Sequence, residues 1–168
     1  MYPTADGIDP RLRRRLMFLR TVLEDRLRVE LREKLGAAYA PRVGNRSSLI
    51  FPGDGFIAVE VLSEPSRADA VADRCLDVAE ALAREGVTPE EVDRLRPVLL
   101  ARLRDRRREN QFWIDVLGSC HGRKGAPEEA RSEMAHCLAT RPEDLTPLAT
   151  RFLGRGNASL LVVRPRGR

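Results

Sequence analysis

Aromatic residues, histidines and lysines are all scarce in this chain. Of its 168 residues only 5% are aromatic and two are histidines, and just two of the 30 basic residues are lysines, Lys34 and Lys124. With so few aromatic rings, a core must be built mainly from Leu, Val and Ala. The hydrophobic share of 42% and the charged share of 33% are ordinary for one globular domain, which we expect to span residues 1–168.

Long apolar runs are absent as well. No stretch approaches the roughly 20 apolar residues that a membrane-spanning helix needs, so no membrane segment is predicted. Residues 1–7 lack a basic region followed by an apolar stretch, and we therefore expect no signal peptide. The compartment stays open between the cytoplasm and the periplasm.

Cysteine is rare and odd in number, which argues against a disulfide framework. Cys75, Cys120 and Cys137 fall in segments that otherwise read as helix, and we expect buried thiols. The pairs Cys120-His121 and His136-Cys137 could be drawn as a four-ligand zinc site. Adjacent residues rarely both reach one metal, and paired zinc ligands are normally about two to four residues apart. We therefore predict no metal site in this chain.

The net charge of +5 and the pI near 9.7 make nucleic-acid binding one hypothesis. Acidic residues are interspersed with the arginines almost everywhere along the sequence. A preference for Arg over Lys with abundant Ala is also what a GC-rich coding sequence produces without selection for a partner. We therefore expect no nucleic-acid partner. The run 102–108 is interpreted as a solvated helix face.

A long amphipathic helix is the first predicted element. Asp9 supplies a side-chain acceptor at the N-cap, and Pro10 takes the first helical position. Leucines then recur every three or four residues as far as Leu35, and Gly36 ends the helix.

Strands are predicted beyond Gly36, where the apolar period changes. They cover 37–47 and 55–63, with a turn at 51–55 between them, and are expected to pair antiparallel. Tyr2-Pro3-Thr4 reads as the end of a further strand that begins upstream of residue 1.

Helices dominate the rest of the chain. Thr88 with Glu91 and Thr140 with Glu143 are two predicted capping boxes, and Pro97 is expected to kink the helix that contains it. The predicted elements are helices over 63–86, 88–117, 128–139 and 140–153, followed by an apolar strand over 159–163.

This order predicts an α+β fold in which a small, mainly antiparallel sheet is covered by long helices on one face. Three strands make a thin sheet for so many helices. We therefore expect a first strand, supplied upstream of residue 1, to be missing from this sequence.

Residues 26–41, which read RLRVELREKLGAAYAP, carry a family resemblance. The segment resembles the second domain of pitrilysin/insulinase-type zinc metallopeptidases, where a long helix ends in an Arg-Glu-Lys-Leu-Gly-like stretch and a Tyr follows on the next strand. The similarity extends over residues 3–165, because four further segments resemble the bacterial two-domain members in order and spacing: 51–53, 86–91, 109–113 and 143–153.

The resemblance implies that this chain has no peptidase centre of its own. In such enzymes two homologous α+β halves enclose a chamber, and the N-terminal half binds zinc through a His-x-x-Glu-His motif. Neither His121 nor His136 lies in such a motif. No catalytic residue is therefore assigned here, and zinc is expected in the partner half.

By the same resemblance, Arg32 and Tyr39 face the zinc across the chamber. The Arg32 guanidinium would hold a substrate carbonyl or carboxylate. The Tyr39 phenol would donate a hydrogen bond to the oxygen that gains charge in the tetrahedral intermediate. The strand from Ala37 is a plausible edge for the addition of an extended substrate.

The sequence thus predicts the substrate-binding half of a zinc metalloendopeptidase, which acts on peptides together with a zinc-bearing N-terminal half in the same or another chain. One alternative is a degenerate relative with a purely structural role in assembly. The other is an Arg-rich nucleic-acid module. Trp113 is interpreted as a core or interdomain packing residue.

Overall fold

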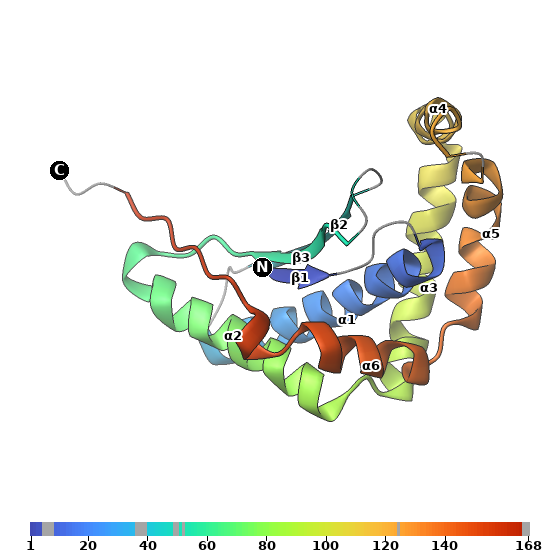
Figure 1. The fold of residues 1–168 in the computed structure, drawn as a ribbon. Helices are drawn as coiled ribbons and strands as arrows, with labels where there is room; N and C mark the ends of the chain where they lie inside the picture. The colour runs from blue at the N-terminus through green and yellow to red at the C-terminus, as the bar shows by residue number, and fades with distance from the viewer. Residues whose placement is uncertain (5–8, 36–39, 49–50, 52, 124, 166–168) are drawn as a thin grey trace.

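The computed structural model describes residues 1–4, 9–35, 40–48, 51, 53–123 and 125–165. Figure 1 shows a thin sheet at the centre of the molecule and helices packed along it. The elements are β1 (Tyr2–Thr4), α1 (Pro10–Leu35), β2 (Arg42–Ser47), β3 (Gly55–Glu60), η1 (Pro65–Arg67), α2 (Ala68–Glu85), α3 (Pro89–Arg108), α4 (Asn110–Ser119), α5 (Ala126–Ala139), α6 (Pro142–Phe152) and η2 (Arg155–Asn157).

The sheet has three antiparallel strands in the order β1-β3-β2. Tyr2 lies opposite Ile57 in one pair of strands, and Asn45 lies opposite Ile57 in the other. The α+β class and the strand at Tyr2–Thr4 are therefore confirmed. The segment 40–41 is not strand, in contrast to the predicted start at residue 37; residues 36–39 lie outside the described part of the chain. Proline at position 41 has no N–H to donate to a ladder.

The two faces of the sheet differ in burial. Tyr2, Val43 and Ile57 point to the core side, where each is at most 3% exposed. The residues between them on the strands, such as Gly44 and Arg46, are exposed on the opposite side, which we call the open face. Figure 1 shows α1, α2 and α6 on the core side, so the helices cover one face, as predicted.

Helix α1 is the spine of the core, and the predicted leucine stripe is confirmed. Leu16, Leu19, Leu23, Leu27 and Leu31 are each 0% exposed. Full burial of one such side chain contributes about 1.5–3 kcal/mol, so this single face supplies much of the hydrophobic stabilisation of the domain.

The turn between α2 and α3 is locked by several contacts. The predicted capping box is confirmed: Thr88 Oγ1 accepts from the Glu91 N–H, and the Glu91 carboxylate accepts from the Thr88 N–H at 2.9 Å. Gly86 has φ of 79°, where a side chain would be strained, and a Cβ there would lie 2.7 Å from Cγ2 of Thr146. Glycine is therefore required at this turn.

The single helix predicted over 88–117 is wrong, because the chain breaks at Glu109. Its φ of −81° and ψ of 132° are extended, so α3 and α4 are separate helices. The predicted cap at Thr140 is also wrong. Thr140 Oγ1 donates to the His136 carbonyl at the end of α5, and the Asp144 carboxylate instead accepts from the Arg141 N–H at 3.1 Å to begin α6.

The predicted C-terminal strand is not formed. Residues 159–163 are extended, but in the described structure only Ser159 makes backbone hydrogen bonds, and its partner is Met1. The third strand of the sheet is thus β1. Among the described residues, no helix combines the length and the apolarity that crossing a membrane requires.

Candidate functional site

Arg32 lies in the last turn of α1 and is exposed to solvent. No hydrogen bond or ion pair joins it to any residue that the structure describes. Tyr39, its predicted partner, falls outside the described residues, so the separation of the two side chains stays a prediction. The connection from α1 to β2 contains only residues 36–41, so few residues separate the end of the helix from the start of β2.

Other arginines of α1 contrast with Arg32 because they are bound to acidic or carbonyl oxygens. Arg26 donates to the Glu91 carboxylate from Nε at 2.6 Å and from Nη2 at 2.9 Å. These hydrogen bonds raise the pKa of Arg26 despite the opposing effect of burial. Arg15 binds Asp144 at 2.5 Å. These two arginines brace the helices, whereas the guanidinium of Arg32 is available to a ligand.

One edge of β2 is not paired with a strand in the described structure. The Ser48 N–H donates to the carbonyl of Asp54 opposite it at 2.8 Å, so the Ser48 N–H points toward the β3 side. Along an antiparallel strand the backbone N–H and C=O groups of successive residues point alternately toward and away from the neighbouring strand. Val43 and Asn45 lie an odd number of residues from Ser48, so their backbone groups point away from β3. We call the line of these groups the free edge of β2.

Arg20 partly covers the free edge. Its Nη1 donates to the Val43 carbonyl at 2.7 Å, and desolvation by burial lowers the pKa of this guanidinium. The Asn45 backbone groups have no such cover. The Asn45 Oδ1 is also buried without a hydrogen-bond partner among the described residues. The stretch around Asn45 is therefore the part of the edge that can accept another extended chain.

The open face beside this edge carries two arginines and one glutamate around small residues, because Glu60 is exposed opposite Arg42. Arg42 and Arg46 of β2 are both exposed on it. Gly44 lies between them opposite Ala58, and nothing lies within 4 Å of the position that a Gly44 Cβ would take. Small residues thus leave room above the middle of the sheet, with Arg46 on one side and Arg42 opposite Glu60 on the other.

The two histidines have no metal-binding surroundings. His121 is exposed, and His136 Nδ1 lies 2.9 Å from Nη1 of Arg14 and 2.8 Å from the Ser132 carbonyl. Across the described part of the chain, no three His, Cys, Asp or Glu side chains gather as metal ligands would. His136 therefore belongs to a polar network that joins α1 to α5.

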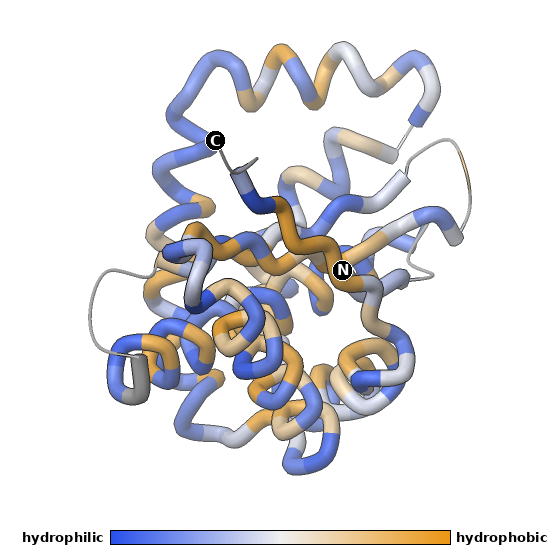
Figure 2. The backbone as a smooth tube through the Cα atoms, turned by 90° about the vertical axis from the view of Figure 1, so that its left-hand side faces the viewer, coloured by the Kyte–Doolittle hydropathy of each residue, from blue (hydrophilic) through white to orange (hydrophobic). Residues whose placement is uncertain are grey.

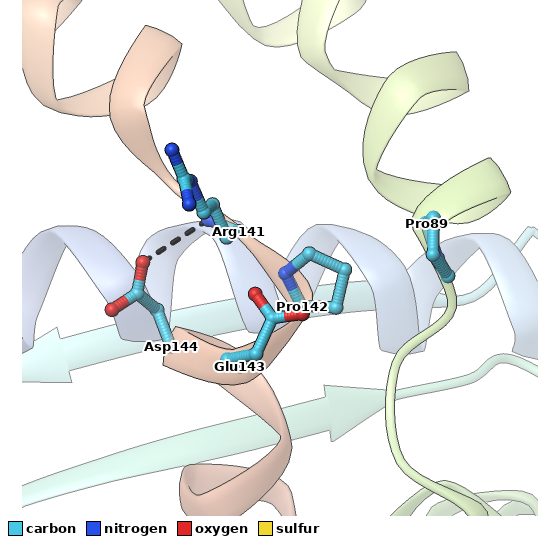
Figure 3. A pocket seen from close by; sticks show the side chains of 5 residues that line it. All are labelled: Pro89, Arg141, Pro142, Glu143 and Asp144. Atoms are coloured by element: carbon cyan, nitrogen blue, oxygen red, sulfur yellow. Dashed lines mark hydrogen bonds between the residues drawn. The ribbon is translucent and has the colours of Figure 1, made fainter.

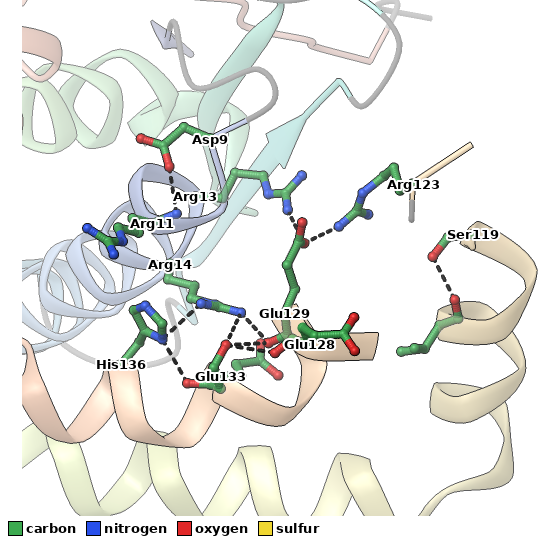
Figure 4. A network of polar contacts seen from close by, with 12 residues as sticks. Asp9, Arg11, Arg13, Arg14, Ser119, Arg123, Glu128, Glu129, Glu133 and His136 are labelled. Carbon is green, nitrogen blue, oxygen red and sulfur yellow. Dashed lines mark hydrogen bonds and ion pairs between the residues drawn. The ribbon is translucent and has the colours of Figure 1, made fainter. Parts of the chain in front are cut away.

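That polar network is centred on Glu129 (Figure 4). Its carboxylate accepts from Arg13 at 2.7 Å and also from Arg123. The network borders a cavity of about 520 Å³ between the start of α1 and helices α4 and α5. Because positive and negative side chains alternate around this cavity and are largely paired, it favours no ligand of one charge.

A second hollow, of about 470 Å³, lies where α3 and α6 begin (Figure 3). Its lining consists of two helix-start prolines, Pro89 and Pro142, with Arg141, Glu143 and Asp144. The Asp144 carboxylate is engaged with the Arg141 N–H at 3.1 Å. The hollow contains no nucleophile with an adjacent base, so it is a junction of helix ends and not a catalytic site.

Cys75 and Cys137 pack with the hydrophobic core, whereas the Cys120 thiol donates to the Val116 carbonyl at 3.3 Å. Cys137 is buried, and Cys75 and Cys120 are partly buried; all three are free thiols. Burial raises the pKa of Cys75 to about 11, so this group stays protonated and unreactive at neutral pH.

Trp113 is not a core residue, which corrects one part of its interpretation. It is 36% exposed, and its Nε1 donates to the Arg107 carbonyl at 2.8 Å. Ile114 and Leu117 on the same helix are 60% and 66% exposed. Helix α4 has no buried residue and presents these three apolar side chains within about a third of its circumference.

The strand from Ala37 was predicted as an edge for an extended substrate, but the sequence alone did not identify Asn45 as its uncovered part, nor the exposed face of α4. The strand pattern around 42–47 was visible, but which backbone groups face away from β3 depends on the register. The sequence analysis placed the apolar residues of α4 at the end of one long helix over 88–117. In such a helix, apolar residues are expected on the buried side.

Comparison with known proteins finds relatives of this chain. Residues 1–99 match the family model described as the peptidase M16 inactive domain. Over 103 residues, which are 59% of this chain, the sequence is 29% identical to the chloroplastic stromal processing peptidase of Pisum sativum. The chain spans only 8% of the length of that relative.

Solved structures agree on the fold. The inactive peptidase domain of a proposed zinc protease from Bordetella parapertussis has a TM-score of 0.75 at 16% identity, over 99% of this chain and 91% of that one. The periplasmic protease PqqL from Escherichia coli has a TM-score of 0.66 at 19% identity, over 90% of this chain but only 17% of that one.

Proposed function

Because the chain belongs to the family of inactive domains of M16 peptidases, we propose that it is the substrate-binding half of a zinc metalloendopeptidase. As an inactive peptidase domain it is a non-catalytic half. Zinc in this proposal belongs to the other half, which would carry out the hydrolysis in the same chain or in a separate one.

The observation that carries the proposal is the free edge of β2. An extended peptide can add to such an edge through main-chain hydrogen bonds, which are independent of its sequence. The Asn45 backbone groups are the uncovered part of this edge, and Arg42 and Arg46 flank the adjoining open face. The proposed ligand is therefore an extended peptide segment, with an acidic side chain favoured only beside Arg46, because Glu60 lies opposite Arg42.

Arg32 and Tyr39 would act on this peptide from the connection between α1 and β2. The exposed Arg32 guanidinium has five N–H donors and no partner among the described residues, so it can bind a peptide carbonyl without breaking another contact. Tyr39 remains assigned by family resemblance, as a hydrogen-bond donor to the reacting carbonyl oxygen. Neither group could replace the zinc ligands and the general base that hydrolysis needs.

The zinc-bearing half needs a surface on this chain, and helix α4 offers one. Trp113, Ile114 and Leu117 form an exposed apolar strip on it. Figure 1 places α4 beyond the sheet on the side opposite α1, α2 and α6, which is the side of the open face. A partner packed there would enclose a peptide between itself and the open face.

The proposed role of the free edge can be tested with two substitutions at Asn45. Asn45→Pro removes an N–H that points away from β3, so it blocks peptide addition without removing a ladder hydrogen bond of the sheet. Asn45→Ala keeps that N–H and is the matched control. Binding of a fluorescently labelled extended peptide, followed by anisotropy, is expected to weaken at least tenfold in Asn45→Pro and to change less than threefold in Asn45→Ala.

Circular dichroism must show that both variants remain folded before their affinities are compared. If the two variants bind the peptide equally well, the free edge is not the binding surface. If neither they nor the unaltered chain bind peptide, the alternative of a structural assembly relative is favoured.

A further inference from the structure

Arg20 occupies an acceptor on the free edge of β2 that an added strand would otherwise use. Its Nη1 donates to the Val43 carbonyl at 2.7 Å. The backbone groups of Val43 and Asn45 both point away from β3, so an antiparallel strand would form hydrogen-bonded pairs with both residues. At Val43 the donor to the carbonyl would be a peptide N–H, and Arg20 already supplies a donor there. The side chain therefore stands where a peptide backbone would continue.

An antiparallel peptide would reach Arg20 at a definite residue. The peptide residue opposite Asn45 can exchange two main-chain hydrogen bonds with it, and the next residue toward the peptide C-terminus lies opposite Gly44. In a longer peptide, the following nitrogen would donate to the Val43 carbonyl. In a peptide that ends opposite Gly44, a carboxylate oxygen takes the place of that nitrogen. Two oxygens then face each other, and a guanidinium beside them can donate to both.

The guanidinium of Arg20 has donors left for such a carboxylate. It carries five N–H groups, and within the described residues its one hydrogen bond is the one to Val43. None of its nitrogens is buried without a partner, so the unused N–H groups reach solvent. The side chain as a whole is half-buried. An anion next to this charge is therefore screened less by solvent than an anion next to a fully exposed arginine.

The charges around Arg20 come from α1 and α3. Burial lowers the pKa of the Arg20 guanidinium; Glu24 opposes this shift, and Arg102 and Arg106 add to it. Arg106 is bound to the Glu133 carboxylate at 2.6 Å, whereas Arg102 makes no ion pair with any residue in the described ranges. Figure 2 shows the end of α3 that carries these arginines, next to α4, as a largely hydrophilic stretch. Glu24 thus offsets only one of two uncompensated guanidinium charges, and this end of the free edge is positive.

We propose that the free edge of β2 binds the C-terminal end of an extended peptide, with the terminal carboxylate on Arg20. This inference rests on the peptide-binding role proposed above and specifies the class of peptide. It also specifies the direction. Because β2 runs from Arg42 to Ser47, an antiparallel peptide brings its C-terminus to Val43. A parallel peptide would bring its positively charged N-terminus to Arg20, and the like charges would repel each other.

The test compares two peptides on the full chain. They share one extended sequence and an N-terminal fluorescent label, and they differ only at the C-terminus, which is a free carboxylate in one and an amide in the other. Anisotropy measures both affinities for the unaltered chain, for Arg20→Gln and for Arg28→Gln. Arg28 is the matched control, because it is an exposed arginine on the same helix. Circular dichroism checks that both variants are folded.

The free-carboxylate peptide should bind the unaltered chain at least tenfold more tightly than the amide, because the amide lacks the charge-assisted hydrogen bonds to the guanidinium. Arg20→Gln should reduce this ratio below about threefold, whereas Arg28→Gln should leave it at about tenfold or more. The comparison on the unaltered chain needs no substitution, so it tests the inference even if Arg20→Gln is unstable.

The other outcomes separate this inference from the proposed function. Equal binding of the two peptides to the unaltered chain would overturn the inference, although the free edge could still bind peptides. A tenfold ratio that persists in Arg20→Gln would place the carboxylate on another group and would also overturn it. Binding of neither peptide would refute the proposed function and this inference together.

Discussion

Replacing Glu91 with glutamine removes a charge from the junction at which α1, α2 and α3 meet. The Glu91 carboxylate accepts two hydrogen bonds from Arg26, at 2.6 and 2.9 Å, and one from the Thr88 N–H at 2.9 Å. Arg26 also donates to the Gly86 carbonyl at 2.8 Å. One side chain therefore ties the start of α3 to the middle of the spine helix that carries Arg32.

The cost of Glu91→Gln follows from these contacts. The Arg26 and Glu91 side chains are only 19% and 13% exposed, so solvent screens the pair weakly. Hydrogen bonds to charged groups contribute about 1.5–3 kcal/mol each, and glutamine keeps part of them through its amide oxygen. We expect a loss of about 2–3 kcal/mol, which corresponds to a fall in Tm of about 4–12 °C for a chain of this size.

The effect depends on pH in a definite direction. Burial opposes ionisation of Glu91, but the hydrogen bonds from Arg26 and from the Thr88 N–H outweigh it and lower its pKa. A lowered pKa in the folded state means that the carboxylate stabilises the fold above the ordinary value of 4.5, and that this stabilisation is lost as the pH falls through the folded-state pKa. The difference between the native chain and Glu91→Gln should therefore shrink below that value.

Thermal unfolding followed by circular dichroism between pH 7 and pH 3 measures this difference. Glu85→Gln is the control, because Glu85 lies 3.7 Å from the same arginine but is 55% exposed, and a pair of that kind contributes about 0.5 kcal/mol or less. A Tm difference for Glu91→Gln that matches the control at pH 7, or that stays constant down to pH 3, would refute the reasoning.

Two other substitutions test the junction and the partner surface. Gly86→Ala should lower the free energy of unfolding by about 2 kcal/mol or more, because the new Cβ meets Thr146 and the residue has positive φ. Urea unfolding measures this loss, and a loss below about 0.5 kcal/mol would contradict the account. The double substitution Ile114→Asp and Leu117→Asp should weaken binding of the zinc-bearing half at least tenfold in calorimetric titration. It should not lower Tm, because both side chains are exposed. Unchanged affinity would show that α4 is not part of the interface.

Much of the fold was predictable because its signals are local. The leucine period of α1 and the capping box at Thr88 depend on residues within a few positions of each other, and both are present in the structure. The antiparallel pairing of two nearby strands follows from the short turn between them. The packing of helices against the sheet was predictable because each amphipathic helix must bury its apolar side.

The errors fall where tertiary contacts decide. The helix break at Glu109 lies in a sequence with good helical propensity, and the packing of Phe112 near Arg106, with 5.1 Å from ring centre to guanidinium, accompanies the change of direction. Thr140 has the right side chain for a cap but bonds backward to α5. The strand at 159–163 has the correct pattern, yet among the described residues it pairs only at Ser159, with Met1.

The candidate site could be predicted only in part. Arg32 came from family resemblance, and its exposure agrees with a ligand-binding role, but an exposed arginine near a helix C-terminus is also favoured by the helix dipole alone. The strand from Ala37 was predicted as an edge, but the outward direction of the Asn45 backbone groups could not be, because shifting the register of β2 by one residue would turn the other set of backbone groups outward.

The most direct test of the central claim is reconstitution with the zinc-bearing half. The chain is mixed with the zinc-bearing half proposed as its partner, and cleavage of a quenched fluorescent peptide is followed with and without a chelator. Arg32→Ala and Tyr39→Phe are compared with Arg28→Ala, an exposed arginine of the same helix that lies 3.8 Å from Asp25.

The account predicts cleavage only in the mixture, loss of cleavage with the chelator, and at least a tenfold lower kcat/KM for Arg32→Ala and Tyr39→Phe, which is about 1.4 kcal/mol of transition-state stabilisation. Arg28→Ala should remain within threefold of the unaltered chain. A mixture that associates but never cleaves, or that cleaves equally well with all three substitutions, would contradict the account.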